Sequence, residues 1–164
     1  MPKEILQNSE EAYSKYGKVG DFKDPLKALS DNLSKFENIL LPKPLDLNAP
    51  SFEGIFKPMQ YDFIHVGNVL HVSPLSATEG FFRFASFALR QDGIVTLYGP
   101  FKRFGEFTTP SNQEFDMKLK ERNSIFGLRD IDSEVIPVAT TFGFQLEDIF
   151  EMPKNNFLMK FSKL

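Results

Sequence analysis

The chain has 164 residues, a formal net charge of −3, 41% hydrophobic residues, 25% charged residues and no cysteine. Its length suits one domain with a continuous core, and its composition is that of a folded globular chain rather than a disordered one. The acidic balance argues against a nucleic-acid-binding protein, and the lack of cysteine excludes disulfides and thiolate metal sites. Because the N-terminus is too polar for a signal peptide and no apolar run reaches about 18 residues, we expect a cytoplasmic protein with no membrane contact.

The first part of the chain predicts little regular structure before one short helix. Residues 1–25 are a polar segment with only faint helical spacing, which begins at Ile5. Residues 26–36 fit an amphipathic helix, because their Leu and Phe side chains recur at steps of three and four. Asp24 suits the N-cap of this helix and Pro25 its first turn.

The next segments predict two strands separated by a loop. Residues 38–47 (NILLPKPLDL) are extended, but Pro42 and Pro44 would disturb the ladder of a central strand. Residues 48–58 form a loop or a short turn of helix. The apolar and β-branched run YDFIHV at residues 61–66 predicts a buried strand.

A helix should follow this strand. Ser76-Ala77-Thr78-Glu79 fits a capping box, in which the Ser76 hydroxyl accepts from the Glu79 backbone N–H. We therefore expect a helix over residues 77–89 with one apolar stripe. The side chains expected to be buried on that stripe are Phe81, Phe84 and Ala88.

A second parallel strand completes this unit. Gly93 is expected to give the helix a left-handed cap, and residues 94–98 (IVTLY) then form a buried strand. Strand, helix and strand at this spacing predict a βαβ unit with a right-handed crossover. Residues 61–66 and 94–98 should therefore be parallel neighbours.

The C-terminal part predicts two helices and a hairpin. The expected elements are a polar loop after Pro100, helices at residues 112–122 and 132–141, and strands at residues 144–151 and 157–163. Five residues connect the last two strands, and so short a connection makes them antiparallel. The fold class is α/β, with a mostly parallel sheet and a C-terminal antiparallel hairpin.

Polar side chains follow both parallel strands of this unit. Asn68 and His71 come directly after the first strand, and Tyr98 ends the second. Ligands of open α/β sheets lie outside the carboxyl ends of the parallel strands. The sequence therefore predicts a ligand site at this edge of the sheet.

Five segments in order add a family resemblance: NVLHVSPLSATEGFFRFASFAL, LYGPF, SNQEFDMKLKERN, FGLRD and MPKNN. Together they resemble the methyltransferase-like 26 family, whose members have the class I (Rossmann-like) fold of S-adenosylmethionine-dependent methyltransferases. The resemblance covers residues 38–164. It implies that residues 38–47 are the third strand of that fold, 61–67 the fourth and 94–99 the fifth, and that the hairpin supplies the last two.

The resemblance also implies roles for individual residues. It places four residues at the cofactor, namely Asp46, Leu47, Asn68 and His71. From their positions, His71 and Tyr98 are the expected catalytic residues. Asn112, Asp116 and Arg129 are expected on the substrate side, and no metal site is expected.

The N-terminal part departs from the family pattern. The family has a first strand and a glycine-rich turn of the form Glu-x-x-x-Gly-x-Gly, whereas Gly17 and Gly20 here follow no apolar strand. Asp21 or Asp24 could fall where the ribose-binding acid sits. We expect an N-terminally shortened member, arising as a truncated gene model, a splice isoform or a real loss. Binding of S-adenosylmethionine should be weak or lost.

Each site residue also has a structural interpretation. His71 fits a general base or cofactor-loop residue as well as a histidine whose ring bonds a backbone carbonyl. Asn112 fits a helix cap and Asp116 a solvent-facing acid paired with Lys120. Arg129 could clamp a carboxylate or, with the adjacent acid at position 130, fix its loop.

The function expected from these residues is methyl transfer from S-adenosylmethionine to an unidentified small-molecule or protein acceptor. The rival is a catalytically inactive binding or regulatory protein, because the glycine-rich turn is missing. In the family's strand order 3-2-1-4-5-7-6, two strands separate residues 38–47 from residues 61–66. Without them the fourth strand has a free edge, which predicts self-association, marginal stability or residues 38–47 moved against that strand.

Overall fold

The computed structural model describes residues 3–8 and 25–164. The chain falls into two compact units, residues 1–47 and 48–164, and each is described here by itself. The expectation of a single domain over the whole chain stays a prediction. None of the helices in the described ranges is long and apolar enough to cross a membrane.

The N-terminal unit contains a pair of parallel strands. Strand β1 (Lys3–Asn8) pairs with β2 (Ile39–Leu45), and helix α2 (Pro25–Leu33) lies between them in the sequence. The faint helical spacing expected around Ile5 is wrong, since this residue lies in β1. KEILQN contains only two apolar residues, too few for a strand signal, and its conformation depends on pairing with a segment more than 30 positions away.

Strand β2 accommodates its prolines through an irregular register. Glu4 is paired with Leu40 and Leu6 with Lys43, so two residues of β2, including Pro42, lie opposite one residue of β1. The strand expected at residues 38–47 is confirmed, but its partner is β1. The alternative that it moves against residues 61–66 stays a prediction.

Helix α2 begins where the sequence predicted but is shorter. Pro25 is its first residue, as expected, and the helix ends at Leu33 rather than at Phe36. Phe36 is 46% exposed, so it adds no packing that would extend the helix. The proposed cap residue Asp24, with Gly17, Gly20 and Asp21, lies outside the described residues.

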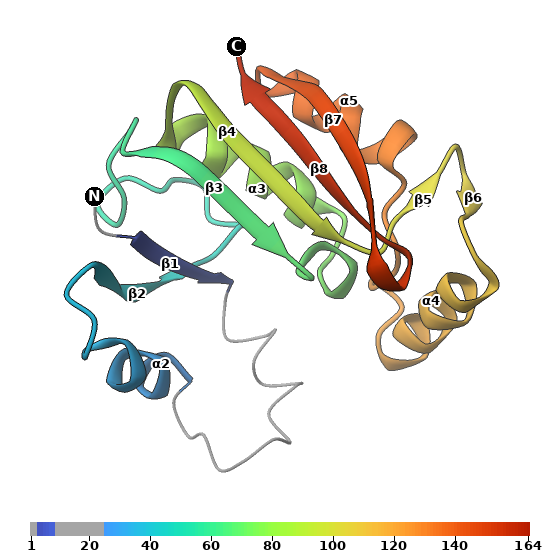
Figure 1. Cartoon of the computed structure of the whole chain (residues 1–164), viewed down its shortest axis with the longest axis horizontal. Helices are drawn as coiled ribbons and strands as arrows, with labels where there is room; N and C mark the ends of the chain where they lie inside the picture. The colour runs from blue at the N-terminus through green and yellow to red at the C-terminus, as the bar shows by residue number, and fades with distance from the viewer. Residues whose placement is uncertain (1–2, 9–24) are drawn as a thin grey trace. The chain divides into compact units, whose positions relative to one another are not determined.

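The C-terminal unit is built on a four-stranded mixed sheet (Figure 1). Its strands lie in the order β3 (Tyr61–Gly67), β4 (Leu89–Gly99), β8 (Asn156–Lys163) and β7 (Phe144–Met152). Strands β3 and β4 are parallel, whereas β8 is antiparallel to both β4 and β7. The parallel pair and the C-terminal hairpin are thus confirmed.

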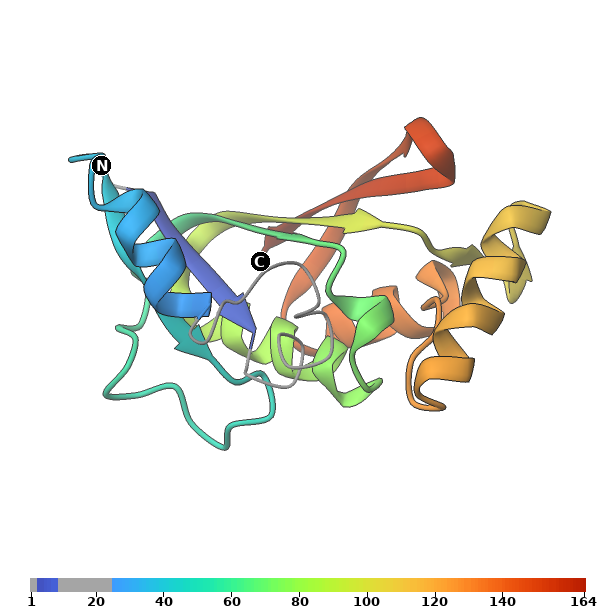
Figure 2. The same cartoon turned by 90° about the horizontal axis from the view of Figure 1, so that it is seen from below.

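Two helices of this unit cover one face of the sheet. Helix α3 (Ser76–Ala88) and helix α5 (Ile136–Thr141) lie together on that face (Figure 2). The predicted stripe is confirmed, because the exposed fractions of Phe81, Phe84 and Ala88 are 3%, 0% and 0%. Phe82 is also fully buried, between the rings of two sheet phenylalanines, Phe144 and Phe161.

The N-terminus of α3 corrects the predicted capping box. The Ser76 hydroxyl donates to the side chain of Asn48 rather than accepting from Glu79. The residue that caps the helix is Leu75, which makes no side-chain capping bond. The helix instead starts with a tight turn, in which the Ala77 N–H donates to the Pro74 carbonyl. The capping box is a pattern of neighbouring residues. It does not form here because the Ser76 hydroxyl bonds to Asn48, which is distant in the sequence.

The C-terminus of α3 corrects the role of Gly93. Helix α3 ends at Ala88 and β4 begins at Leu89, so residues 90–93 lie within an irregular stretch of the strand. Asp92, not Gly93, has the left-handed backbone, with φ of 61°. Gly93 is required for another reason: a Cβ there would lie 2.8 Å from the Arg90 carbonyl oxygen.

The segment after β4 contains more structure than expected. The region predicted as a polar loop holds a small antiparallel hairpin of β5 (Lys102–Arg103) and β6 (Glu106–Phe107). Helix α4 (Pro110–Arg122) starts two residues before the predicted position. The helix expected at residues 132–141 is divided into a π-helical turn, η2 (Ile131–Val135), and α5. The remaining elements are two short 3₁₀ turns, η1 (Leu70–Val72) and η3 (Pro153–Asn155).

Candidate functional site

The candidate site is the segment that leaves the carboxyl end of β3. Asn68 takes the left-handed conformation, with φ of 58°, and its N–H donates to the Tyr98 carbonyl at 2.9 Å. Asparagine tolerates this backbone better than most residues. The chain then forms η1, and the Ser73 hydroxyl donates back to the Val69 carbonyl. This turn directs the segment across the end of β4.

Two polar side chains of this segment meet at Gly99, the last residue of β4. The Asn68 Oδ1 and the His71 Nδ1 each lie 3.6 Å from the position that a Cβ on Gly99 would occupy. The Phe101 ring lies 3.7 Å from the same point. Gly99 has φ of 157°, which a residue with a side chain rarely adopts. A side-chain-free backbone at the carboxyl ends of two parallel strands is therefore flanked by an amide and an imidazole.

His71 is buried without a hydrogen bond to its ring. Its exposed fraction is 8%, and no described residue hydrogen-bonds either ring nitrogen. The alternative of a ring satisfied by a backbone carbonyl is therefore wrong within the described residues. Burial, with a smaller contribution from the positive charge of Arg129, lowers the pKa of His71 from 6.5 to about 4. The imidazole is neutral at pH 7 and can accept a proton or a hydrogen bond.

Tyr98 has a partner of its own. Its hydroxyl accepts a hydrogen bond from the Asn156 side chain at 2.9 Å, and Asn156 begins β8. Successive residues of a strand face opposite sides of a sheet, so Tyr98 and the open face of Gly99 point in different directions. A catalytic role for Tyr98 stays a prediction, and the structure gives it a contact within the sheet.

Asn112 and Asp116 both lie on the buried side of α4. The Asn112 amide donates to the Thr108 hydroxyl and to the Asn155 carbonyl, each at 3.1 Å, while Thr109 is the residue that caps the helix. The expectation of a solvent-facing acid is wrong for Asp116, which is 3% exposed. Its carboxylate accepts from the Leu128 N–H at 2.8 Å, in addition to the expected ion pair with Lys120.

Arg129 fixes two neighbouring loops. One terminal nitrogen donates to the Ser73 carbonyl and, at 3.4 Å, to the Ile125 carbonyl. Its Nε is buried and has no hydrogen-bond partner among the described residues. Burial lowers the pKa of Arg129, and the charges of Glu134 and Asp116 oppose that shift. The guanidinium thus anchors the end of the 68–73 segment, and a contact with substrate stays a prediction.

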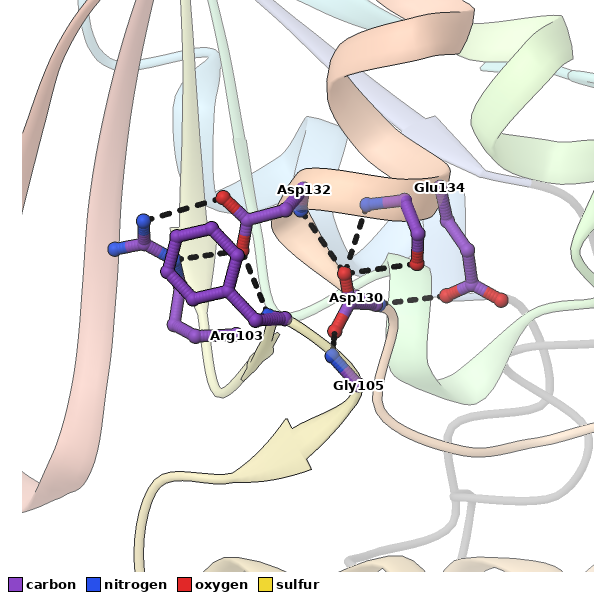
Figure 3. Close-up of polar contacts among 7 residues, drawn as sticks. Arg103, Gly105, Asp130, Asp132 and Glu134 are labelled. Atoms are coloured by element: carbon purple, nitrogen blue, oxygen red, sulfur yellow. Dashed lines mark hydrogen bonds and ion pairs between the residues drawn. The ribbon is translucent and has the colours of Figure 1, made fainter.

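Asp130 is the centre of a polar network between β5 and η2 (Figure 3). Its carboxylate accepts from the N–H groups of Gly105, Asp132 and Ser133 at 2.6, 3.0 and 2.8 Å. Although burial opposes it, this set of hydrogen bonds holds the pKa of Asp130 below its usual range. Arg103 makes two bonds to Asp132 at 2.9 and 3.2 Å. The network supports the structural interpretation, in which Asp130 fixes its loop.

The two remaining predicted residues belong to the N-terminal unit. Asp46 directly follows β2 and is exposed, whereas Leu47 is 3% exposed. The position of Asp46 at the carboxyl end of this strand agrees with the one that the resemblance implies. Contact of either residue with a cofactor stays a prediction.

One contact near the site was not anticipated from the sequence. Gly99 was expected at the strand end that faces the crevice, whereas Phe115 was noted only as a neighbour of Asn112 and Asp116. The ring centroids of Phe115 and His71 lie 5.5 Å apart in a T-shaped arrangement. No local pattern predicts this contact, because it joins η1 to a residue of α4 that lies 44 positions later.

Comparison with protein families matches residues 13–163 to the model described as "Protein of unknown function (DUF938)". The match covers most of the chain. The protein belongs to this family. The family description assigns no activity, and the narrower resemblance to methyltransferase-like 26 is not tested by it.

Solved structures show the fold. The chain is similar to PigF with S-adenosylhomocysteine (SAH), at a TM-score of 0.65 and 16% identity over 99% of this chain and 50% of that one. It is also similar to the pyocyanin biosynthetic protein PhzM, at a TM-score of 0.63 and 15% identity over 99% of this chain and 43% of that one. A third match is OxaC in complex with SAH and oxaline, at a TM-score of 0.64 and 11% identity over 99% of this chain and 36% of that one. The chain has the class I methyltransferase fold and spans half or less of the length of these proteins.

Proposed function

We propose that this protein acts in methyl transfer from S-adenosylmethionine to a small-molecule or protein acceptor. The observation that carries the proposal is the convergence of Asn68 and His71 on the bare backbone of Gly99. Neither side chain has a hydrogen-bond partner among the described residues, although His71 is buried. Both groups are therefore available to hydrogen-bond a ligand at this edge of the sheet.

The residues present fit the methionine part of that cofactor. A Cβ on Gly99 would fill the space beside both polar groups, and the glycine leaves this space open. When bound, S-adenosylmethionine supplies an electrophilic methyl group on a sulfonium. Asn68 and His71 would orient the cofactor and the acceptor, and positioning accounts for most of the catalysis in such a displacement. The neutral His71 ring can also accept a proton from the acceptor.

A second candidate is a catalytically inactive binding or regulatory protein of the same fold. Strand β1 is followed by Ser9-Glu10-Glu11, and the first glycine after it is Gly17. The glycine-rich turn whose backbone would approach the carboxypropyl and ribose groups does not follow this strand. We therefore propose that this form binds S-adenosylmethionine weakly or not at all.

Within the family shown by comparison, we propose the methyltransferase-like 26 proteins as the nearest group. Five ordered segments support this placement, and all of them lie in the C-terminal unit: residues 68–89, 97–101, 111–123, 126–130 and 152–156. The acceptor is not specified by these segments.

Calorimetric titration with S-adenosylmethionine and SAH tests the proposal. We expect weak binding to the chain and tighter binding to a version extended at the N-terminus with a first strand and a glycine-rich turn. In the extended version, Asn68→Ala and His71→Ala should each weaken binding, while the exposed-site control Met117→Ala should not. Binding that is unchanged in both site variants would contradict the proposal. Transfer of a labelled methyl group by the extended version would exclude the inactive alternative.

A further inference from the structure

We propose that Phe115 is the positioning residue that orients the His71 imidazole, an inference that rests on the proposed function for its consequence in binding. A catalytic histidine is usually oriented by a hydrogen bond from one ring nitrogen. The described residues provide no such bond to His71. Packing must therefore set the direction of this ring.

Two neighbours of the ring are Gly99 and Phe115. The His71 Nδ1 faces the open side of Gly99, and Phe115 meets the ring with an interplanar angle of 67°. Aromatic rings favour this edge-to-face geometry, because the positive edge of one ring lies against the negative face of the other. Phe115 thus replaces the missing hydrogen bond as the orienting contact.

The structure holds both partners of this contact in place. The backbone of His71 is fixed by the hydrogen bond from the Gly127 N–H to its carbonyl at 3.0 Å. On α4, Asn112 one turn before Phe115 and Asp116 next to it are buried and hydrogen-bonded to other segments. A rigid helix therefore presents Phe115 to a rigid turn, and only the imidazole is left to be oriented.

Phe115 is itself 37% exposed, more than a residue needed only for the core. Removing its ring should cost little stability, because much of its surface already faces solvent. Its removal should instead release the His71 ring. Helix α4 offers a matched control in Met117, which is 52% exposed on the same helix.

Two measurements test the proposal, and the first uses the chain without any extension. The first is the ¹⁵N and ¹³C NMR spectrum of the His71 ring, which reports its tautomer and mobility without any ligand. Phe115→Ala should change these signals, Phe115→Tyr should restore them, and Met117→Ala should leave them unchanged. A His71 spectrum that is the same in Phe115→Ala and in the unsubstituted protein would overturn the proposal, whether or not the protein binds cofactor.

The second measurement is SAH affinity in a double-mutant cycle with the N-terminally extended version. An edge-to-face contact of this kind corresponds to roughly a 2- to 12-fold loss of affinity for Phe115→Ala. The loss should disappear in a His71→Ala background, because Phe115 acts through that ring. Additive losses would show that Phe115 acts independently of His71 and would overturn the proposal. Failure of the extended version to bind SAH would contradict the proposed function alone, and the ring spectrum would still decide the role of Phe115.

Discussion

Burial without a hydrogen bond is what distinguishes His71 from the other polar residues near the site. Asn112, Asp116 and Arg129 are just as buried, but each makes at least one hydrogen bond to another segment. These bonds explain their burial without any ligand. His71 has no such explanation, so the candidate site is centred on it and on the adjacent Asn68.

The low pKa of His71 predicts a pH dependence of stability. The folded-state pKa is about 4 and the unfolded value is 6.5, so the unfolded chain binds more protons between these pH values. The free energy of unfolding should therefore fall as the pH drops from 6.5 to 4, by at most about 3 kcal/mol. Urea unfolding at several pH values should show this loss, and His71→Gln should reduce it.

An unchanged slope in His71→Gln over that interval would show that the ring titrates normally in the folded protein. The carboxylates of Asp130 and Asp132 also have lowered pKa values, but from a starting value of 3.8. Their contribution to stability is lost only at more acidic pH. The two effects therefore occupy separate pH intervals.

Asp116 should matter for stability rather than for substrate. Asp116→Ala leaves the buried Leu128 N–H without its acceptor and should cost about 1–3 kcal/mol. The matched control is Glu114→Ala on the same helix, since Glu114 makes only an exposed ion pair with Lys118. The control should leave the melting temperature unchanged. Equal melting temperatures for both variants would mean that the Asp116 bond adds nothing to stability.

The elements of the C-terminal unit show what local patterns can predict. YDFIHV and IVTLY both lie in strands, as predicted, but β4 begins five residues before the predicted start. The expectation that the first strand is buried is wrong for most of its side chains, since Ile64 is buried but Phe63 is 56% exposed. The boundaries of α3 were less predictable, because the Ser76 side chain bonds to Asn48 and the chain turns into β4 before Gly93. These outcomes depend on tertiary contacts that no short window contains.

Similar limits apply to the segment between β4 and α5. The hairpin of β5 and β6 has two-residue strands, which are too short to show alternation. It is fixed instead by Asp130 and Asp132, which lie more than 20 positions later and accept from Gly105 and Phe104 (Figure 3). The sequence predicted that the ends of β3 and β4 lie at the same edge of the sheet. It did not predict that the Asn68 and His71 side chains meet at Gly99.

The network around Asp130 predicts a coupled loss of two elements. Asp130→Ala removes the acceptor for the first N–H groups of η2 and for Gly105, and should cost about 2 kcal/mol or more. Hydrogen exchange should then accelerate both in η2 and in the turn between β5 and β6. Ser133→Ala removes one bond of the same network and should have a smaller effect. Faster exchange in only one of the elements would contradict a shared anchor.

At the scale of the whole molecule, the edge of the four-stranded sheet at β3 favours association with another chain. Strand β3 is the first in the order β3-β4-β8-β7, so one side of it has no partner within that sheet. Unpaired edges promote association with other chains. We therefore propose that the protein self-associates through this edge.

Light scattering over a range of concentrations tests this association. Phe63 lies on β3 and is 56% exposed, so Phe63→Lys adds charge at the edge without disturbing the core, and it should reduce association. The control is Phe150→Lys, because Phe150 is 46% exposed on β7, the opposite edge of the sheet. A monomer at all concentrations, or equal effects of both substitutions, would contradict association through β3.

The central claim is that a ligand of the S-adenosylmethionine type binds at the carboxyl ends of β3 and β4. The most direct test is to follow the backbone NMR signals of the protein while adding SAH. The account predicts that the signals of Asn68, His71 and Gly99 shift first and most, even if saturation requires high concentrations. Shifts confined to other parts of the chain, or no shifts in an N-terminally extended version, would contradict it.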